Sequence, residues 1–161
     1  MIIKYDEYPL IPLRGLVIPH TSVMPIFVGR ASSLYAVEAA SAADKKAVFV
    51  TQKSTEIDSP SKDDLYDVGV VADIVQILKM PDGSLKLLIE AYQRAEIIKV
   101  IEQKSADSSY TIAKIKPLHE KGNIDNRTLA LIDILRQLFE SYSKFDDKVH
   151  NDAVILVNQI Q

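Results

Sequence analysis

Glycine spacing is the first place to look for chemistry in this sequence, because nucleotide-binding loops depend on it. A phosphate-binding loop, GxxxxGK[ST], uses closely spaced glycines so that backbone amides surround the phosphates and a lysine reaches them. The chain has five glycines: Gly15, Gly29, Gly69, Gly83 and Gly122. None has a second glycine at the required offset, none precedes Lys-Ser or Lys-Thr, and the GxGxxG pattern is absent as well. These spacings exclude ATP binding through a loop of either kind.

Hydrolytic catalysis has only weak candidates. The nucleophile motif GxSxG is absent, and the neighbours Lys53-Ser54 and Ser61-Lys62 fall in a polar segment. A catalytic lysine must be desolvated to lose its proton near neutral pH, which a polar segment does not provide. The adjacent carboxylates Asp63-Asp64 are better interpreted as solvated charge than as an acid–base pair, and His20 has no evident catalytic partner. We therefore expect no catalytic residue in this chain.

Metal and thiol chemistry lack the residues that they need. The sequence contains no cysteine, which removes disulfides, thiolate catalysis, iron–sulfur clusters and cysteine-based zinc sites together. The three histidines, His20, His119 and His150, do not have the short spacing of a helical metal pair. We expect no cofactor and no metal within these residues.

The charge of the chain argues against a nucleic-acid partner. Lysine and arginine number 19 against 22 aspartates and glutamates, so the formal net charge is −3. The longest cationic run is Lys45-Lys46, and the segment 53–67 is acidic. Neutralising a phosphate backbone requires a basic stripe, which these residues do not supply.

Neither a membrane span nor a secretory signal is visible in the sequence. No apolar run approaches the ~20 residues of a membrane-spanning helix. The first seven residues, MIIKYDE, lack the cationic start and long apolar stretch of a signal peptide. We therefore expect a cytoplasmic protein.

The apolar and turn residues predict a β-rich domain with one short helix. Apolar runs predict strands at 9–13, 24–28, 47–50, 68–80, 85–89, 95–101 and 110–116, and an alanine-rich stretch predicts a helix over 33–43. Ser32 or Ser33 can cap that helix, the polar segment 53–64 should be an exposed loop, and Pro81-Asp82-Gly83-Ser84 suits a tight turn. Long strands in this number usually close on themselves. We therefore expect an α+β fold, a mostly antiparallel β-barrel or semi-barrel, over residues 1–118.

The character of the chain changes after residue 118. Asp125 can cap a helix whose apolar residues, from Leu129 to Phe145, recur every three to four positions. A helix this apolar needs a partner, so we expect 119–161 to be the truncated start of a helical subdomain. Residues 151–161 fit a strand by propensity or a helix by spacing, and this alternative stays open.

Surplus apolar residues gather in one predicted loop. The segment 16–24, LVIPHTSVM, is more apolar than a loop requires. It can close one end of the barrel, or it can offer an adhesive surface to other chains. If it binds other chains, we expect the contacts at Val17, Ile18, Pro19 and Met24, with Tyr35 of the first helix as an aromatic neighbour.

Three blocks of this sequence resemble the N-terminal domain of the bacterial ATP-dependent protease Lon. Residues 10–30, LIPLRGLVIPHTSVMPIFVGR, are similar to the family's opening pattern. Residues 64–83, DLYDVGVVADIVQILKMPDG, and residues 89–95, IEAYQRA, match two further family blocks in order and spacing. Ala91 stands where glycine is usual, and Ile18 and His20-Thr21 depart from the family pattern within the apolar loop.

The resemblance implies a non-catalytic part of a larger machine. The family's N-terminal domain has a PUA-like barrel that helps to recognise unfolded or damaged proteins and helps oligomer assembly. The parent would be a cytoplasmic, typically hexameric, ATP-dependent serine endopeptidase. Its ATPase module, which uses ATP and magnesium, and its peptidase with a Ser-Lys dyad would follow this domain.

Three other functions are compatible with parts of the sequence. The chain can be a stand-alone adaptor of the same domain family. It can be an RNA-binding module, since PUA-like barrels elsewhere bind RNA, although its charge disfavours this. An independent enzyme is the third alternative, and the missing motifs argue against it.

Overall fold

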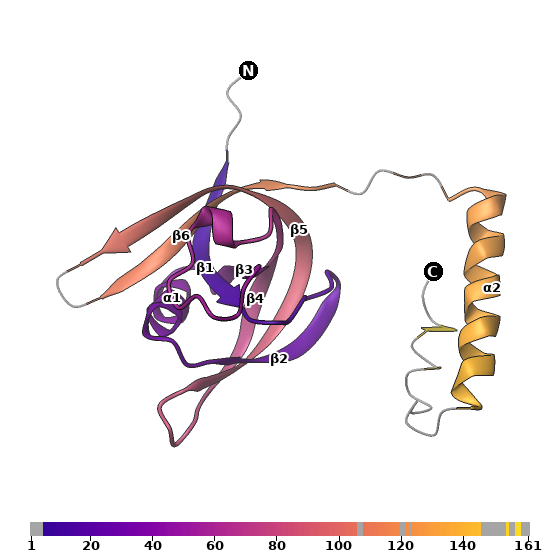
Figure 1. The fold of residues 1–161 in the computed structure, drawn as a ribbon, viewed down its shortest axis with the longest axis horizontal. Helices are drawn as coiled ribbons and strands as arrows, with labels where there is room; N and C mark the ends of the chain where they lie inside the picture. Colours follow the sequence, from indigo (N-terminus) through magenta and orange to yellow (C-terminus); the bar gives the residue numbers. More distant parts are fainter. Residues whose placement is uncertain are drawn as a thin grey trace. The chain divides into compact units, whose positions relative to one another are not determined.

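The computed structural model describes residues 5–105, 108–119, 122, 124–145, 154, 157 and 158. The chain divides into two compact units, Met1–His119 and Glu120–Gln161. The elements in chain order are β1 (Asp6–Leu13), β2 (Ser22–Val28), α1 (Ala31–Ala42), β3 (Lys46–Thr51), the short 3-10 helix η1 (Lys62–Asp64), β4 (Val68–Lys79), β5 (Leu85–Lys104), β6 (Ser109–Pro117) and α2 (Asn126–Ser143). Figure 1 labels the strands and the two α-helices.

The first unit is built on a mixed sheet of six strands in the order β2-β5-β4-β3-β1-β6. An additional pairing of β6 with β5 joins β5, β4, β3, β1 and β6 into a closed circuit, with β2 on the outer edge of β5. The pairing of β1 with β3 is parallel and the other pairings are antiparallel. The expectation of a mostly antiparallel sheet with one short helix is thus correct for this unit.

The prediction of separate strands at 85–89 and 95–101 is wrong, because both belong to the 20-residue strand β5. The strand pairs with β2 from Leu85 to Ala91, with β4 as far as Glu96, and with β6 from Ala95 onward. Register shifts between Val71 and Ala72, and between Ile97 and Lys99, mark irregularities that allow the strand to bend from one set of partners to the other. The polar residues between the two halves hid this continuity.

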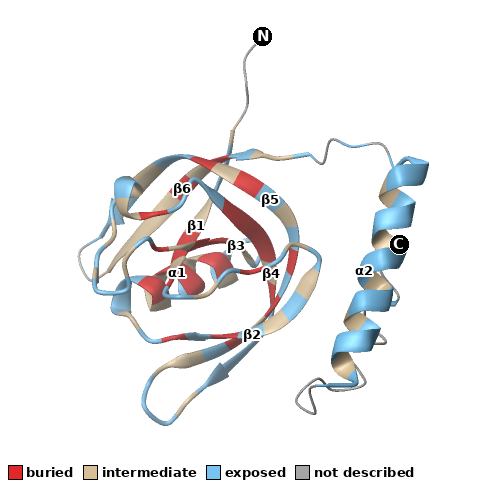
Figure 2. Cartoon of the chain, turned by 45° about the vertical axis from the view of Figure 1, so that its right-hand side comes forward, coloured by how far each residue is buried: buried red, intermediate tan, exposed pale blue. Residues whose placement is uncertain are grey.

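The core consists of two clusters of buried side chains, one on each side of β3. Ala47 and Phe49 belong to the first cluster, which also includes one face of α1, whereas Val48 and Val50 belong to the second. Successive side chains of a strand point to opposite faces, so a strand buried on both faces reads as a continuous apolar run. Figure 2 shows the buried positions on the sheet and on one side of α1.

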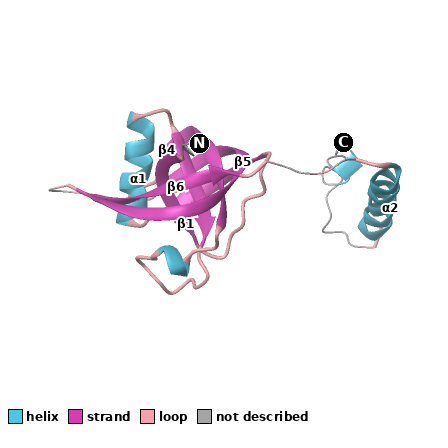
Figure 3. Cartoon of the chain, turned by 90° about the horizontal axis from the view of Figure 1, so that it is seen from above, coloured by secondary structure: helices cyan, strands magenta, loops and turns pink. Residues whose placement is uncertain are grey.

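The helix α1 lies alongside the strands and packs chiefly against β1 and β6 (Figure 3). Its N-cap is Arg30, whose side chain makes no cap hydrogen bond. The prediction that Ser32 or Ser33 caps the helix is therefore wrong. Ser33 instead lies in the first turn, on the buried face of the helix that also carries Ala36, Val37 and Ala40.

The turn between β4 and β5 has the geometry that its composition predicts. Gly83 adopts a φ of 85°, which favours glycine. Its N–H donates to the carbonyl of Met80 at 3.0 Å, and Asp82 Oδ1 accepts from the Ser84 N–H at 2.9 Å. These bonds hold the hairpin at the point predicted from Pro81-Asp82-Gly83-Ser84.

The second unit contains α2. Asp125 is its N-cap, and the carboxylate accepts hydrogen bonds from the backbone N–H and the hydroxyl of Thr128, both at 2.8 Å. No residue of α2 is buried, and six of its large apolar side chains are exposed: Leu129, Leu131, Ile134, Leu135, Leu138 and Tyr142. The open alternative for residues 151–161 lies largely outside the described residues; among them Val154, Val157 and Asn158 are described, and these three are helical.

In the described part of the chain, no helix combines the length and the apolar character that crossing a lipid bilayer requires.

Candidate functional site

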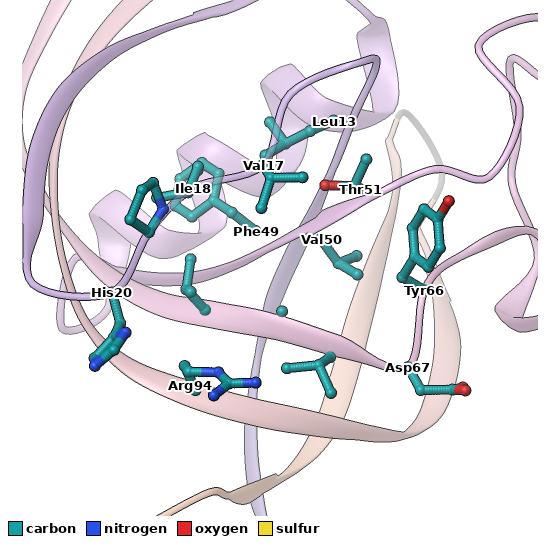
Figure 4. Close-up of a pocket in the computed structure, with 14 residues that line it drawn as sticks. Leu13, Val17, Ile18, His20, Phe49, Val50, Thr51, Tyr66, Asp67 and Arg94 are labelled. Carbon is teal, nitrogen blue, oxygen red and sulfur yellow. The ribbon is translucent and has the colours of Figure 1, made fainter. Parts of the chain in front are cut away.

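A pocket of about 620 Å³ opens beside the loop that connects β1 to β2. Five segments supply its lining: Leu13 at the end of β1, this loop, the end of β3, the start of β4 with the two residues before it, and Arg94 of β5. Figure 4 shows Val17 and Ile18 on the loop side and Tyr66 and Asp67 on another. Most of the lining side chains are apolar, and Asp67 and Arg94 add one charge of each sign.

Hydrogen bonds hold the loop over the pocket. The hydroxyl of Thr51 donates to the carbonyl of Leu16 at 2.6 Å, and the hydroxyl of Ser22 donates to the carbonyl of Pro19 at 2.5 Å. Gly15 and Thr21 both adopt a φ of 62°, so the loop reverses direction near each end through left-handed residues. These bonds tie the loop to β3 and to the start of β2, so the apolar residues between them have defined positions.

Only part of the predicted contact set comes together here. Val17, Ile18 and Pro19 all line the pocket. Val17 is 73% exposed, whereas Ile18 is 6% exposed and belongs to the first core cluster. Ile18 therefore contributes mainly to the core and Val17 to the surface.

Met24 and Tyr35 lie elsewhere. Met24, on β2, is half-buried and packs against the first core cluster. Tyr35, on α1, lines a different pocket together with Arg30 and Asp58. The structure thus separates these two residues from the loop residues with which they were grouped.

Sequence reasoning missed the opposite wall of the pocket. Tyr66 is 53% exposed and Val68 is also exposed, and both precede the buried part of β4. Gly69 follows them, and a Cβ atom there would lie 2.6 Å from the carbonyl oxygen of Phe49. A glycine at the start of an apolar strand is a signal for close backbone approach, and it marks where β4 meets the end of β3.

A second apolar surface covers one face of the strands β2, β5 and β4. Cross-strand register places Phe27 opposite Lys86 and Lys86 opposite Leu78, while Pro25 lies opposite Leu88. Directly paired residues share a face of a sheet. We call the set Val23, Pro25, Phe27, Leu78 and Leu88 the outer apolar face.

The outer apolar face is open to solvent. Phe27 is 65% exposed, and Val23 and Leu78 are exposed as well. The ammonium group of Lys86 lies 5.7 Å from the centre of the Phe27 ring, close enough for a cation–π contact. Sequence reasoning placed Pro25 and Phe27 in a strand at 24–28 and Val23 in the apolar loop. It did not identify this surface, because apolar residues on both faces of β2 do not show which face is covered.

Two polar groups that line the first pocket already have hydrogen-bond partners within the chain. Lys62 donates to Asp67 at 2.6 Å, and this hydrogen bond together with the charge of Lys62 lowers the pKa of the Asp67 carboxyl. The hydroxyl of Thr51 is already used to hold the loop. In the part of the chain that the structure describes, no three His, Asp or Glu side chains are grouped so as to hold a metal ion.

Comparison with known proteins gives one consistent result. The family model of the ATP-dependent protease La (LON) substrate-binding domain matches residues 7–161. The Lon protease of Buchnera aphidicola subsp. Baizongia pistaciae is 37% identical over 157 residues, which is 98% of this chain and 20% of that protein. The Lon protease of Bacillus thuringiensis is 38% identical over 154 residues, which is 95% of this chain and 19% of that protein. The chain therefore spans about a fifth of the length of these curated relatives.

Solved structures share the fold. The N-terminal domain of Mycobacterium avium complex Lon protease superposes with a TM-score of 0.73 at 15% identity, covering 96% of this chain and 76% of that one. A Lon N-terminal domain protein from Xanthomonas campestris gives a TM-score of 0.59 at 12% identity, covering 83% of this chain and 73% of that one.

Proposed function

We propose, from the premise that this chain belongs to the family of ATP-dependent protease La (LON) substrate-binding domains, that it captures unfolded or damaged polypeptides for a Lon-type protease. The observation that carries this proposal is the exposed apolar area of the first unit, in the pocket beside the β1–β2 loop and on the outer apolar face. Unfolded chains differ from folded ones chiefly in their exposed apolar side chains, and these two surfaces can bury such side chains.

Binding by one such domain should be weak. Each surface is open and offers a few apolar side chains, so that the area buried by one segment of substrate is small. A parent with several copies, typically a hexamer, would bind one unfolded chain at several points and gain affinity through effective concentration. We propose, from the family resemblance, that the domain also helps oligomer assembly.

In this proposal the chain itself is non-catalytic. ATP and magnesium would be bound by an ATPase module, and peptide bonds would be cut by a Ser-Lys dyad, in other parts of a cytoplasmic parent. We propose also that the closed circuit of β5, β4, β3, β1 and β6 is a barrel of the PUA-like type. The net charge of the whole chain, −3, disfavours the RNA binding known for such barrels elsewhere.

The test is a titration of the isotope-labelled chain with a protein held unfolded by reduction and carbamidomethylation, followed by amide chemical shifts. We expect shifts around Val17 and Tyr66, around Phe27 and Leu78, or at both surfaces. The paired variants V17S/Y66S and F27S/L78S each remove the apolar side chains of one surface. At least one of them should weaken binding by about threefold to tenfold.

Ile98→Ser provides the matched control, since Ile98 is an exposed apolar residue of β5 outside both surfaces. It should bind as the parent chain does. A titration without chemical-shift changes, or equal weakening by all three variants, would contradict direct capture by these surfaces.

A further inference from the structure

Another pocket lies along an unpaired strand edge. Its volume is about 430 Å³, and it lies between β2, from Pro25 to Val28, and the chain from Ile11 to Leu16. Gly29, Arg30 and Ser33, at the start of α1, complete the lining. The first unit thus has a cavity along one side of β2 that is separate from the pocket beside the β1–β2 loop.

The edge of β2 that does not face β5 has no partner strand. In the strand order β2 is terminal, and within the described residues β5 is its sole neighbour. An unpaired strand edge presents a row of backbone N–H and C=O groups to any extended chain. Native proteins usually cover such an edge or interrupt it, and β2 is interrupted by a single proline, Pro25.

Pro25 indicates which backbone groups of β2 point away from β5. Proline occurs in an edge strand where its missing N–H would have faced outward. Residues of the same parity share this direction, so the N–H groups of Val23 and Phe27 point to the open side. Their carbonyl groups point the same way, together with that of Pro25.

On the opposite wall of the pocket, some of the hydrogen-bonding groups already have partners. The guanidinium of Arg30 donates to the carbonyl of Pro12, and the rest of that guanidinium is engaged with Gln52 at 2.6 Å and with the carbonyl of Asp58 at 3.3 Å. One polar group beside the pocket remains unused. The hydroxyl of Ser33 is buried and makes no hydrogen bond, although most buried polar groups in native proteins are paired.

We propose that an extended segment of the unfolded substrate adds to the open edge of β2 as a further strand. The inference rests on the proposed function and names how the substrate is held, through its backbone as well as its apolar side chains. Pro25 and Phe27 belong both to this pocket and to the outer apolar face, so the added strand would be continuous with that face. Because β2 carries no charged side chain, backbone pairing there would not depend on the charge of the substrate.

Alternate N-methylation of a substrate peptide tests this directly. The parent probe is a short, fluorescently labelled, alanine- and leucine-rich peptide, and two derivatives carry N-methyl groups on the odd or on the even residues. An added strand uses the N–H groups of one parity only. We expect one derivative to bind at least about tenfold more weakly than the other, because it loses its donors and its methyl groups clash with β2.

Equal binding of the two derivatives, whether both are retained or both lost, would overturn edge pairing. If both bind like the parent peptide, capture by apolar surfaces stands and only this inference fails. If the parent peptide itself does not bind, the proposed function fails with it. Self-association of the chain through β2, seen by sedimentation at the concentrations used, would identify a second copy as the occupant and also overturn the proposal.

A variant that should bind more tightly tests whether the peptide pairs with the open edge of β2. Pro25→Val restores an outward N–H and places an apolar, β-branched side chain on the outer apolar face. It should bind the parent peptide about threefold more tightly, as one added hydrogen bond predicts. Pro60→Val, in the loop before η1, is the matched control and should leave binding unchanged. Unchanged or weaker binding by Pro25→Val would contradict the proposal.

Discussion

Gly69 shows at the scale of one residue how the sequence controls the approach of two strands. Its backbone passes so close to β3 that a Cβ atom would lie 2.6 Å from the carbonyl oxygen of Phe49 and 3.1 Å from Val50 Cβ. The nearest obstacle is backbone, which cannot rotate away as a side chain can. Gly69, Phe49 and Val50 also line the pocket beside the β1–β2 loop, so Gly69 contributes both to the packing of the strands and to the pocket.

Gly69→Ala should therefore lower the free energy of unfolding by roughly 2 to 3 kcal/mol, since β4 must move away from β3. Urea denaturation measures this change. Gly122→Ala is the control, because a Cβ atom there meets nothing within 4 Å. Equal stability of the two variants would show that β4 and β3 separate at little cost.

Two neighbouring residues of β2 show that residue type alone does not predict burial. Ile26 is 2% exposed and Phe27 is 65% exposed, yet both are large and apolar. Their alternation is visible in the sequence, but which of the two faces is covered depends on where α1 and β1 lie. Residue types alone therefore predict a strand at 24–28 without showing which of its two faces is buried.

At the scale of elements, local signals were reliable where a few adjacent residues decide the structure. The 81–84 turn and the cap of α2 at Asp125 were both predicted and both form. The continuity of β5 was not predicted, because bulges and partner strands, rather than its own residues, decide that it continues through residues 90–94.

The start of α2 should depend on pH through Asp125. Hydrogen bonds from the backbone N–H and hydroxyl of Thr128 lower the pKa of this carboxyl in the folded state. A lowered pKa means that the cap contributes fully above the unfolded value of about 3.9 and is lost as the pH falls through the folded value. Protection of the Thr128 amide from hydrogen exchange should fall in acid over that range.

Asp125→Asn is the informative variant, because asparagine caps helices without titrating. It should keep the protection of the Thr128 amide at neutral pH and lose most of its dependence on acid. If the variant shows the same acid transition as the parent chain, another group controls the start of α2.

At the scale of the whole molecule, both core clusters lie within the first unit. A unit with its own core can fold alone. A chain of residues 1–119 should therefore have the same free energy of unfolding as the β-rich unit of the full chain, within about 0.5 kcal/mol. Urea denaturation of both chains measures this difference. A larger loss would show that residues 120–161 contribute to the stability of the sheet.

The sequence by itself determined the elements that depend on neighbouring residues: the apolar runs of the strands, the turn at 81–84, the cap at Asp125, and the three blocks that identify the family. These features need only local hydrogen bonds and the alternation of side chains. Tertiary structure alone decided the parallel pairing of β1 with β3 and the exposure of Phe27 beside buried Ile26. It also decided that Val17, Tyr66 and Arg94 line one pocket. Each of these requires pairing between segments distant in sequence, where register and burial are set by partners that no local pattern specifies.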